Sequence, residues 1–132
     1  MASIRVRNPL APRLRRTRMI LARDIESTLK AVGDELVNEI DKNLSGRVLH
    51  FRTGRLWASW RDPIVTRLTK SWTLTLGSDV PYARIHEFGG WTGAGHRTHI
   101  PQRPYLRRAV LKLMPRIKKR LQNAVWDILR WT

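Results

Sequence analysis

The sequence contains no cysteine, which excludes disulfide bonds and thiolate metal ligands. It is also poor in acidic residues, with 10 Asp and Glu against 26 Lys and Arg. No apolar run approaches the ~20 residues that span a bilayer, and the basic N-terminal segment lacks the apolar core of a signal peptide. We therefore expect a soluble protein that is made and used without export and has no membrane partner.

The charge imbalance is the most unusual property of the composition. A net charge of +16 attracts polyanions and repels other copies of the chain, so nucleic acid is the first partner to consider and an anionic membrane surface the second. A length of 132 residues, of which 42% are hydrophobic, is sufficient for one globular domain but not for two.

Residues 1–16 form a basic segment with five arginines, two prolines and no acid. Pro9 and Pro12 disfavour a helix, so we expect an extended N-terminal arm followed by a single domain over residues 17–132. Two interpretations remain open for the arm. It is either a disordered, solvated tail or a segment that lies along DNA or a neighbouring subunit.

A long amphipathic helix is predicted from about Thr17 to Leu44, and Gly46 is a suitable end for it. Its apolar residues recur at steps of three or four and comprise Leu21, Ile25, Leu29, Val32, Leu36, Ile40 and Leu44. Six of the ten acids of the chain also lie in this segment, and three of them share one flank of the apolar stripe: Asp24, Glu35 and Glu39.

This acidic flank predicts a basic partner, because like charges on one flank repel each other. Two interpretations remain open. In the first, the flank contacts a basic face of a neighbouring subunit in a ring. In the second, it is a solvated face with ion pairs inside the helix, such as Glu26 with Lys30.

Residues 51–60 predict a short helix, capped by Thr53, that holds Leu56, Trp57 and Trp60. Because the two tryptophans are three positions apart, both are expected on one side of the helix. Packing in the core is the first interpretation, and stacking on a nucleic-acid base is the alternative.

Two short segments after this helix predict an antiparallel hairpin, Pro63–Leu68 and Trp72–Leu76. Trp72, Leu74 and Leu76 are expected to share one face of the second strand.

The middle of the chain is divided by glycine and proline. A turn from Tyr82 to Phe88 ends at a glycine pair, and a glycine-rich loop that contains Trp91 then leads to Arg103-Pro104, where a helix begins. Trp91 either docks on a partner or folds back on its own domain.

The last predicted helix runs from Pro104 to about Trp131, and its apolar stripe continues in phase through Pro115. We therefore expect one helix with a bend near Pro115. Residues 103–130 carry nine basic side chains and a single acid. Candidates for contact with DNA phosphates in a channel share one face and are Arg108, Lys112, Arg116, Lys119 and Arg130. The alternative is an ordinary solvated or membrane-attracted face.

Catalytic and metal-binding patterns are weak. His96 and His99 supply too few ligands for zinc, and the adjacent pair His86 and Glu87 has no accompanying nucleophile motif. We expect Glu87 to pair with an arginine such as Arg103 or Arg55 and so to fix the loop against the last helix. No catalytic residue, metal ligand or cofactor is predicted.

Three elements occur in order between about residues 51 and 110: Arg-Thr-Gly-x-Leu-x-x-Ser, Tyr-Ala-x-x-His-Glu-Phe-Gly and Arg-Pro-Tyr-Leu-x-x-Ala. Together they resemble the tail-completion or neck proteins of tailed bacteriophages, including the Mu-like virion morphogenesis proteins. The residues that match these motifs, together with Trp91 in the loop between them, are expected to serve assembly: Arg52, Thr53, Gly54, Leu56, Tyr82, Ala83, His86, Glu87, Phe88, Gly89, Trp91, Arg103, Pro104 and Tyr105.

The expected fold is α+β, with the long N-terminal helix and the kinked C-terminal helix packed on one face of a small antiparallel sheet. The resemblance implies a structural, non-enzymatic virion protein that forms a ring, expected to be hexameric, at the head-tail junction and lets DNA pass. Implied partners are other copies of the chain and neighbouring proteins such as the tail terminator, the tail tube and the head-closure or connector proteins. The competing interpretation, drawn from the net charge, is a stand-alone nonspecific nucleic-acid-binding protein.

Overall fold

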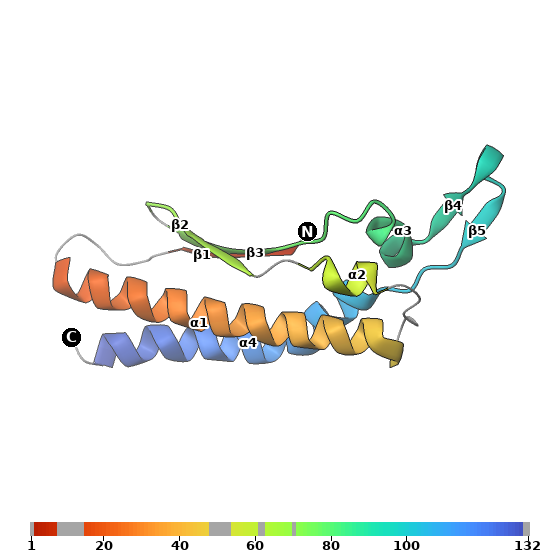
Figure 1. Cartoon of the computed structure of the whole chain (residues 1–132). Coiled ribbons are helices and arrows are strands. Elements are labelled where there is room, and N and C mark those ends of the chain that lie inside the picture. The colour runs from red at the N-terminus through yellow and green to blue at the C-terminus, as the bar shows by residue number, and fades with distance from the viewer. Residues whose placement is uncertain (1, 8–14, 48–53, 61–62, 70, 131–132) are drawn as a thin grey trace.

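The computed structural model describes residues 2–7, 15–47, 54–60, 63–69 and 71–130 (Figure 1). Its regular elements, in chain order, are β1 (Ala2–Arg7), α1 (Arg15–Lys42), a wider helical turn (Asn43–Arg47), α2 (Arg55–Ala58), β2 (Ile64–Arg67), β3 (Ser71–Leu76), α3 (Ala83–Phe88), β4 (Gly90–Thr92), a 3-10 turn (Ala94–His96), β5 (Thr98–Ile100) and α4 (Tyr105–Arg130).

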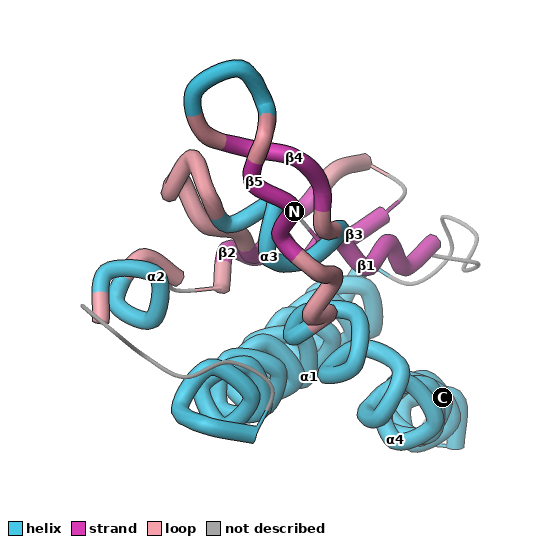
Figure 2. Tube along the Cα trace, turned by 90° about the vertical axis from the view of Figure 1, so that its right-hand side faces the viewer, coloured by secondary structure: helices cyan, strands magenta, loops and turns pink. Residues whose placement is uncertain are grey.

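The three-stranded sheet has the order β1-β3-β2 and is antiparallel throughout. α1 lies across one face of this sheet, and α4 runs antiparallel alongside α1 (Figure 1). Viewed end-on, both helices lie on the same side of the sheet (Figure 2). This arrangement confirms the expected α+β fold. α4 continues as one helix through Pro115, and the bend expected there stays a prediction.

The core forms where α1 meets the sheet and α4. All seven apolar positions predicted for the α1 segment are buried, as are Trp72, Leu74 and Leu76 on one face of β3. α4 adds buried side chains at helical spacing, and these are Tyr105, Ala109, Leu113 and Ile117. Gly33 permits the close approach of α1 to the sheet, because a Cβ there would lie 2.8 Å from Cγ of Pro63. The predicted hairpin is also confirmed as β2 and β3.

The N-terminal segment is extended, as expected, but residues 2–7 are not a free tail. They form β1 and pair with β3 from Ala2 opposite Leu76 to Arg7 opposite Ser71. Contact of the arm with DNA or a neighbouring subunit stays a prediction. Antiparallel pairing satisfies the main-chain groups of β3 on its second edge, which explains why the segment is recruited despite its charge. Residues 8–14 lie outside the described part of the chain.

The two tryptophans near α2 also behave differently from the prediction. Trp60 packs edge-on against Tyr105, with ring centroids 5.8 Å apart, whereas Trp57 is exposed. α2 is only one turn long and ends at Ala58, so Trp60 lies beyond it and does not share its face with Trp57. The predicted cap, Thr53, lies outside the described residues, and Gly54 precedes the helix in a left-handed conformation without a side-chain cap.

Candidate assembly site

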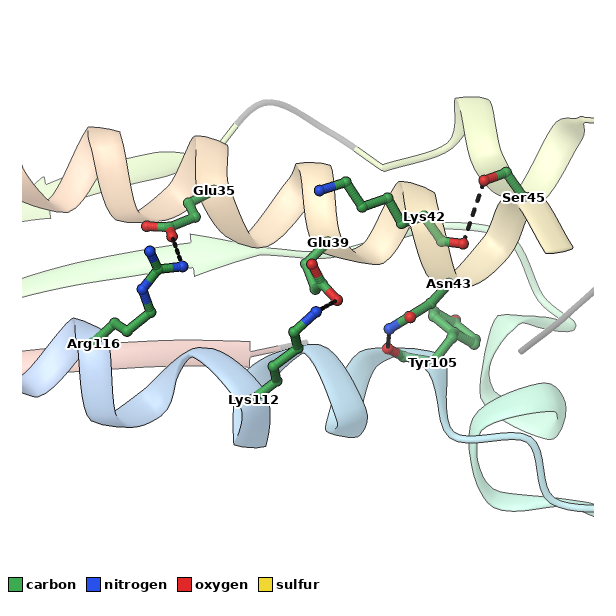
Figure 3. Close-up of polar contacts among 8 residues, drawn as sticks. All are labelled: Glu35, Glu39, Lys42, Asn43, Ser45, Tyr105, Lys112 and Arg116. Carbon is green, nitrogen blue, oxygen red and sulfur yellow. Dashed lines mark hydrogen bonds and ion pairs between the residues drawn. The ribbon is translucent and has the colours of Figure 1, made fainter. Parts of the chain in front are cut away.

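Tyr105 connects four segments that are distant in the sequence. Its hydroxyl donates to the carbonyl oxygen of Ala83 at 3.3 Å, and its ring packs against Trp60. Its own carbonyl oxygen accepts a hydrogen bond from the side-chain amide of Asn43 at 2.8 Å (Figure 3). These contacts tie α3, the segment after α2 and the helical turn that follows α1 to the start of α4. Burial, and then the nearby Glu87 carboxylate, raise the pKa of Tyr105, so the hydroxyl stays protonated and can donate.

Glu87 caps the N-terminus of α4 from a different part of the chain. Its two carboxylate oxygens accept hydrogen bonds from the main-chain N–H groups of Leu106 at 2.9 Å and Arg107 at 2.8 Å. Pro104 precedes the helix and has no side-chain oxygen with which to cap it. The buried carboxylate of Glu87 therefore satisfies two of the free N–H groups and lies at the positive end of the helix dipole.

The sequence predicts an arginine as the partner of Glu87, but its carboxylate accepts from these main-chain amides instead. The expected consequence, a loop fixed against the last helix, is observed. Arg103 instead bonds through its main-chain N–H to the carbonyl oxygen of His86 at 2.9 Å. α3 and the start of α4 are thus joined by both main-chain and side-chain hydrogen bonds. The motif residues that lie in these segments act first as a structural junction.

His86 lies at this junction, and its ring contacts Tyr82 edge-on at 5.9 Å. Burial, and then the charge of Arg103, lower the pKa of His86 from its ordinary value, because both disfavour the imidazolium. The folded protein therefore binds this proton less readily than the unfolded chain. The free energy of unfolding is therefore highest above about pH 6.5, the pKa of this histidine in the unfolded chain. It falls as the pH drops from there through the lower pKa of the folded protein.

We expect the His86→Gln variant to lose less thermal stability than the parent between pH 7.5 and pH 5.0, because glutamine cannot take up a proton. Thermal unfolding at several pH values in one buffer series checks this, with the exposed His96→Gln variant as control. Parallel pH profiles for the parent and the His86→Gln variant would show that His86 is not responsible.

The segment after α3 forms a projecting two-stranded hairpin rather than the predicted loop. β4 pairs with β5, Trp91 lies opposite His99, and the ring centroids of this pair are 4.9 Å apart. Every residue from Trp91 to His99 is exposed, and Figure 1 shows the hairpin extending beyond the ends of the helices. Trp91 thus contacts its own hairpin but is not buried in the domain, so its indole remains available to a partner.

Gly89 fixes the direction in which the hairpin leaves the domain. It has a φ of 71°, and a Cβ at this position would lie 2.8 Å from the main-chain nitrogen of Gln102. Its N–H donates to Ile85 at 2.8 Å and so ends α3. Any side chain would be strained here, which gives this motif glycine a physical function.

The acidic flank of α1 meets basic residues of the same chain. Lys112 donates to Glu39 at 2.7 Å, and Arg116 and Arg120 donate to Glu35 at 3.2 and 2.9 Å (Figure 3 shows the first two pairs). The predicted basic partner therefore exists, but for Glu35 and Glu39 it is α4 rather than a neighbouring subunit. Asp24, the third residue of the flank, is exposed.

These pairs also change the interpretation of the basic face of α4. All five predicted phosphate-contacting side chains are exposed, namely Arg108, Lys112, Arg116, Lys119 and Arg130. Lys112 and Arg116 also form ion pairs with carboxylates of α1. Contact of this set with DNA stays a prediction.

Not every predicted motif residue can be placed. Arg52, like Thr53, lies outside the described residues, while Leu56 packs against the core. Asn43 was missed by sequence reasoning, although a polar residue beside the apolar stripe at Ile40 and Leu44 was a usable signal. Within the described ranges no group of His, Asp and Glu is arranged to hold a metal ion. The described helices include none that combines the length and the apolar character needed to cross a membrane.

The fold is a small α+β domain in which the hydrogen-bonded junction between α3 and α4 holds the β4-β5 hairpin away from the helices and the sheet. The chain belongs to the phage virion morphogenesis family, whose model matches residues 55–130, more than half of the sequence. This membership confirms the resemblance drawn from the motifs.

The chain is also similar to the Mu-like prophage FluMu G protein 2 of Haemophilus influenzae, with 52% identity over 31 residues. This segment is 24% of the present chain and 22% of that protein, so the match spans about a fifth of the relative's length. No solved structure matches the chain. The family supports a structural or morphogenetic function in a phage virion, and it points to a virion location and away from an enzymatic activity.

Proposed function

We propose that this protein is a tail-completion or neck subunit that assembles as a ring, expected to be hexameric, at the head-tail junction of a tailed phage. The observation that carries the proposal is the projecting hairpin, in which Trp91 is exposed while Glu87 and Tyr105 brace its base. Such a braced element favours docking on another protein, because little order has to be gained on binding. Neighbouring tail-terminator, tail-tube and head-closure or connector proteins are the proposed partners.

The charge distribution supports passage of DNA beside the assembled subunits. Exposed cations on α4 include Arg107, Arg108, Lys118 and Lys119, and they would neutralise phosphates without reading base sequence. DNA contact is therefore proposed as nonspecific, with no chemical step on the nucleic acid.

A nonsense mutation in the gene of the phage that encodes this protein tests the proposed position. We expect DNA-filled heads and complete tails to accumulate separately in negative-stain micrographs, and supply of the wild-type chain in trans to restore joined particles. A mutant lysate with normally joined, infectious particles would contradict a neck function, and so would one that lacks tails altogether.

The net charge of +16 favours one alternative, a stand-alone nonspecific nucleic-acid-binding protein. Such a protein would be absent from purified virions and would bind duplex DNA as a monomer, with an affinity that falls steeply as salt increases. Quantitative mass spectrometry of purified particles separates the two functions, because a neck subunit is expected at a fixed stoichiometry to the other tail proteins.

A further inference from the structure

Of the nine large apolar side chains that are exposed in the described residues, six lie towards the two ends of the molecule, and the other three are Trp57, Ile64 and Leu111. Phe88 and Trp91 lie at the hairpin end. At the other end, α1 begins, α4 finishes and the turn between β2 and β3 points the same way (Figure 1). The exposed apolar side chains on these three segments are Met19, Ile20, Leu68 and Trp126. Their positions define a hairpin end and a helix end of one elongated subunit.

The helix end contains a shallow cleft in the last turns of α4, lined by Asn123, Trp126, Asp127 and Arg130. Asp127 is the single acid in residues 103–130. The antiparallel register set by the ion pairs of Glu39 with Lys112 and of Glu35 with Arg116 places Asp127 level with Asp24 of α1. Both aspartates are exposed, while Arg130 lines the same cleft, so this end combines apolar surface with charges of both signs and offers Asp127 as a carboxylate in the cleft.

The hairpin end carries a cation that could pair with the carboxylate of Asp127. Residues 88–104 contain no acid, and the exposed Arg97 lies in the same hairpin as Trp91. Tryptophan and arginine are both enriched as anchors in protein interfaces, because the first supplies apolar area and the second a directed charge. The surface that suits the two is apolar and bordered by a carboxylate, as the helix end is.

We propose that the hairpin of one copy docks on the helix end of the next copy, with Trp91 against Trp126 and Arg97 directed to Asp127. This head-to-tail contact rests on the proposed ring function and specifies its geometry. Two different surfaces on one subunit generate a ring when the rotation closes, whereas a twofold dimer would use the same surface twice. The exposed cations of α4 then lie between the ends and remain available to DNA.

Cysteine cross-linking tests the contact directly, because the chain has no cysteine of its own. Thr92→Cys places a thiol beside Trp91, and Asn123→Cys places one in the cleft, while both tryptophans and both charges are kept. The double variant, oxidised mildly in assembled particles and as concentrated protein, is expected to give a covalent ladder beyond the dimer. Each single variant is expected to remain monomeric on a non-reducing gel.

The matched control combines Thr92→Cys with Leu111→Cys. Leu111 is exposed, as Asn123 is, but it lies in the first third of α4 and away from the cleft, so no ladder is expected from this pair. Adding Trp91→Ser to the double-cysteine variant should weaken self-association by about tenfold or more, the loss typical of a central aromatic anchor.

Dimers from the Thr92→Cys single variant would indicate a twofold contact and overturn the head-to-tail geometry. Particles that contain the double variant but yield no ladder would also overturn it, and they would leave the neck function intact. Absence of the protein from particles would instead reject the proposed function. A ladder from concentrated protein alone would in that case still support the head-to-tail contact.

Discussion

Replacing Tyr105 with alanine is expected to lower the free energy of unfolding by about 3 to 5 kcal/mol, the range for removal of a buried aromatic side chain. Tyr105 is only 2% exposed and contacts Trp60, so truncation leaves a cavity that rigid helices close incompletely. It also removes the hydrogen bond to Ala83 and with it a link between α3 and α4. Urea unfolding followed by circular dichroism measures the loss.

Tyr105→Phe is the matched control, because it keeps the ring and removes only the hydroxyl. We expect a loss of about 0.5 to 1.5 kcal/mol, the usual value for one hydrogen bond. Replacing the exposed Leu111 with alanine should change stability by less than about 0.5 kcal/mol. Equal losses for Tyr105→Ala and Leu111→Ala would contradict the central position given to Tyr105.

Replacing Glu87 with alanine is expected to cost about 2 to 3 kcal/mol, because two N–H groups at the start of α4 lose their acceptor and the helix dipole loses its anion. Glu87→Gln retains one oxygen acceptor without the charge, so its expected loss is smaller, about 1 kcal/mol. The local signature is faster amide exchange at Leu106 and Arg107, the two groups that Glu87 accepts from.

Hydrogen exchange measured by NMR separates this capping effect from general destabilisation. In the Glu87→Ala variant the first turn of α4 should open more readily than the segment around Leu113, which lies in the core. Uniform acceleration along the whole of α4 would show that Glu87 does not act as a cap. The loss of order at the hairpin base should also weaken any assembly that depends on Trp91.

Periodicity was sufficient to predict the two long helices and the β2-β3 hairpin. Apolar residues at steps of three and four fixed the buried face of α1, and alternation fixed the buried face of β3. Helical phase likewise showed that α4 continues through Pro115. The spacing of apolar side chains predicted these elements because each of them packs one face in the core.

Contacts between segments that are distant in the sequence could not be predicted from periodicity. β1 was missed because a segment rich in arginine and proline has the composition of a tail, and only pairing with β3 makes it a strand. The β4-β5 hairpin was missed because strands of three residues among glycines show no alternation. The Glu87 cap joins residues 19 and 20 positions apart, so no local capping pattern revealed it.

The pairing of α1 with α4 explains why neither interpretation of the acidic flank named the partner that the structure shows. The charge pattern predicts a cation opposite Glu35 and Glu39, but periodicity does not tell which helix supplies it. Once α4 lies antiparallel to α1, Lys112 and Arg116 fall within reach. Two of the other exposed acids, Asp24 and Asp127, lie at the helix end, where the contact with the next copy is proposed.

A cryo-EM reconstruction of the head-tail junction in purified particles, at a resolution that shows indole rings, is the most direct test. The prediction is a closed ring of this chain in which each Trp91 contacts the Trp126 end of the next subunit and α4 cations border the DNA path. Density for the chain elsewhere in the particle, or a junction built without it, would contradict the proposed function.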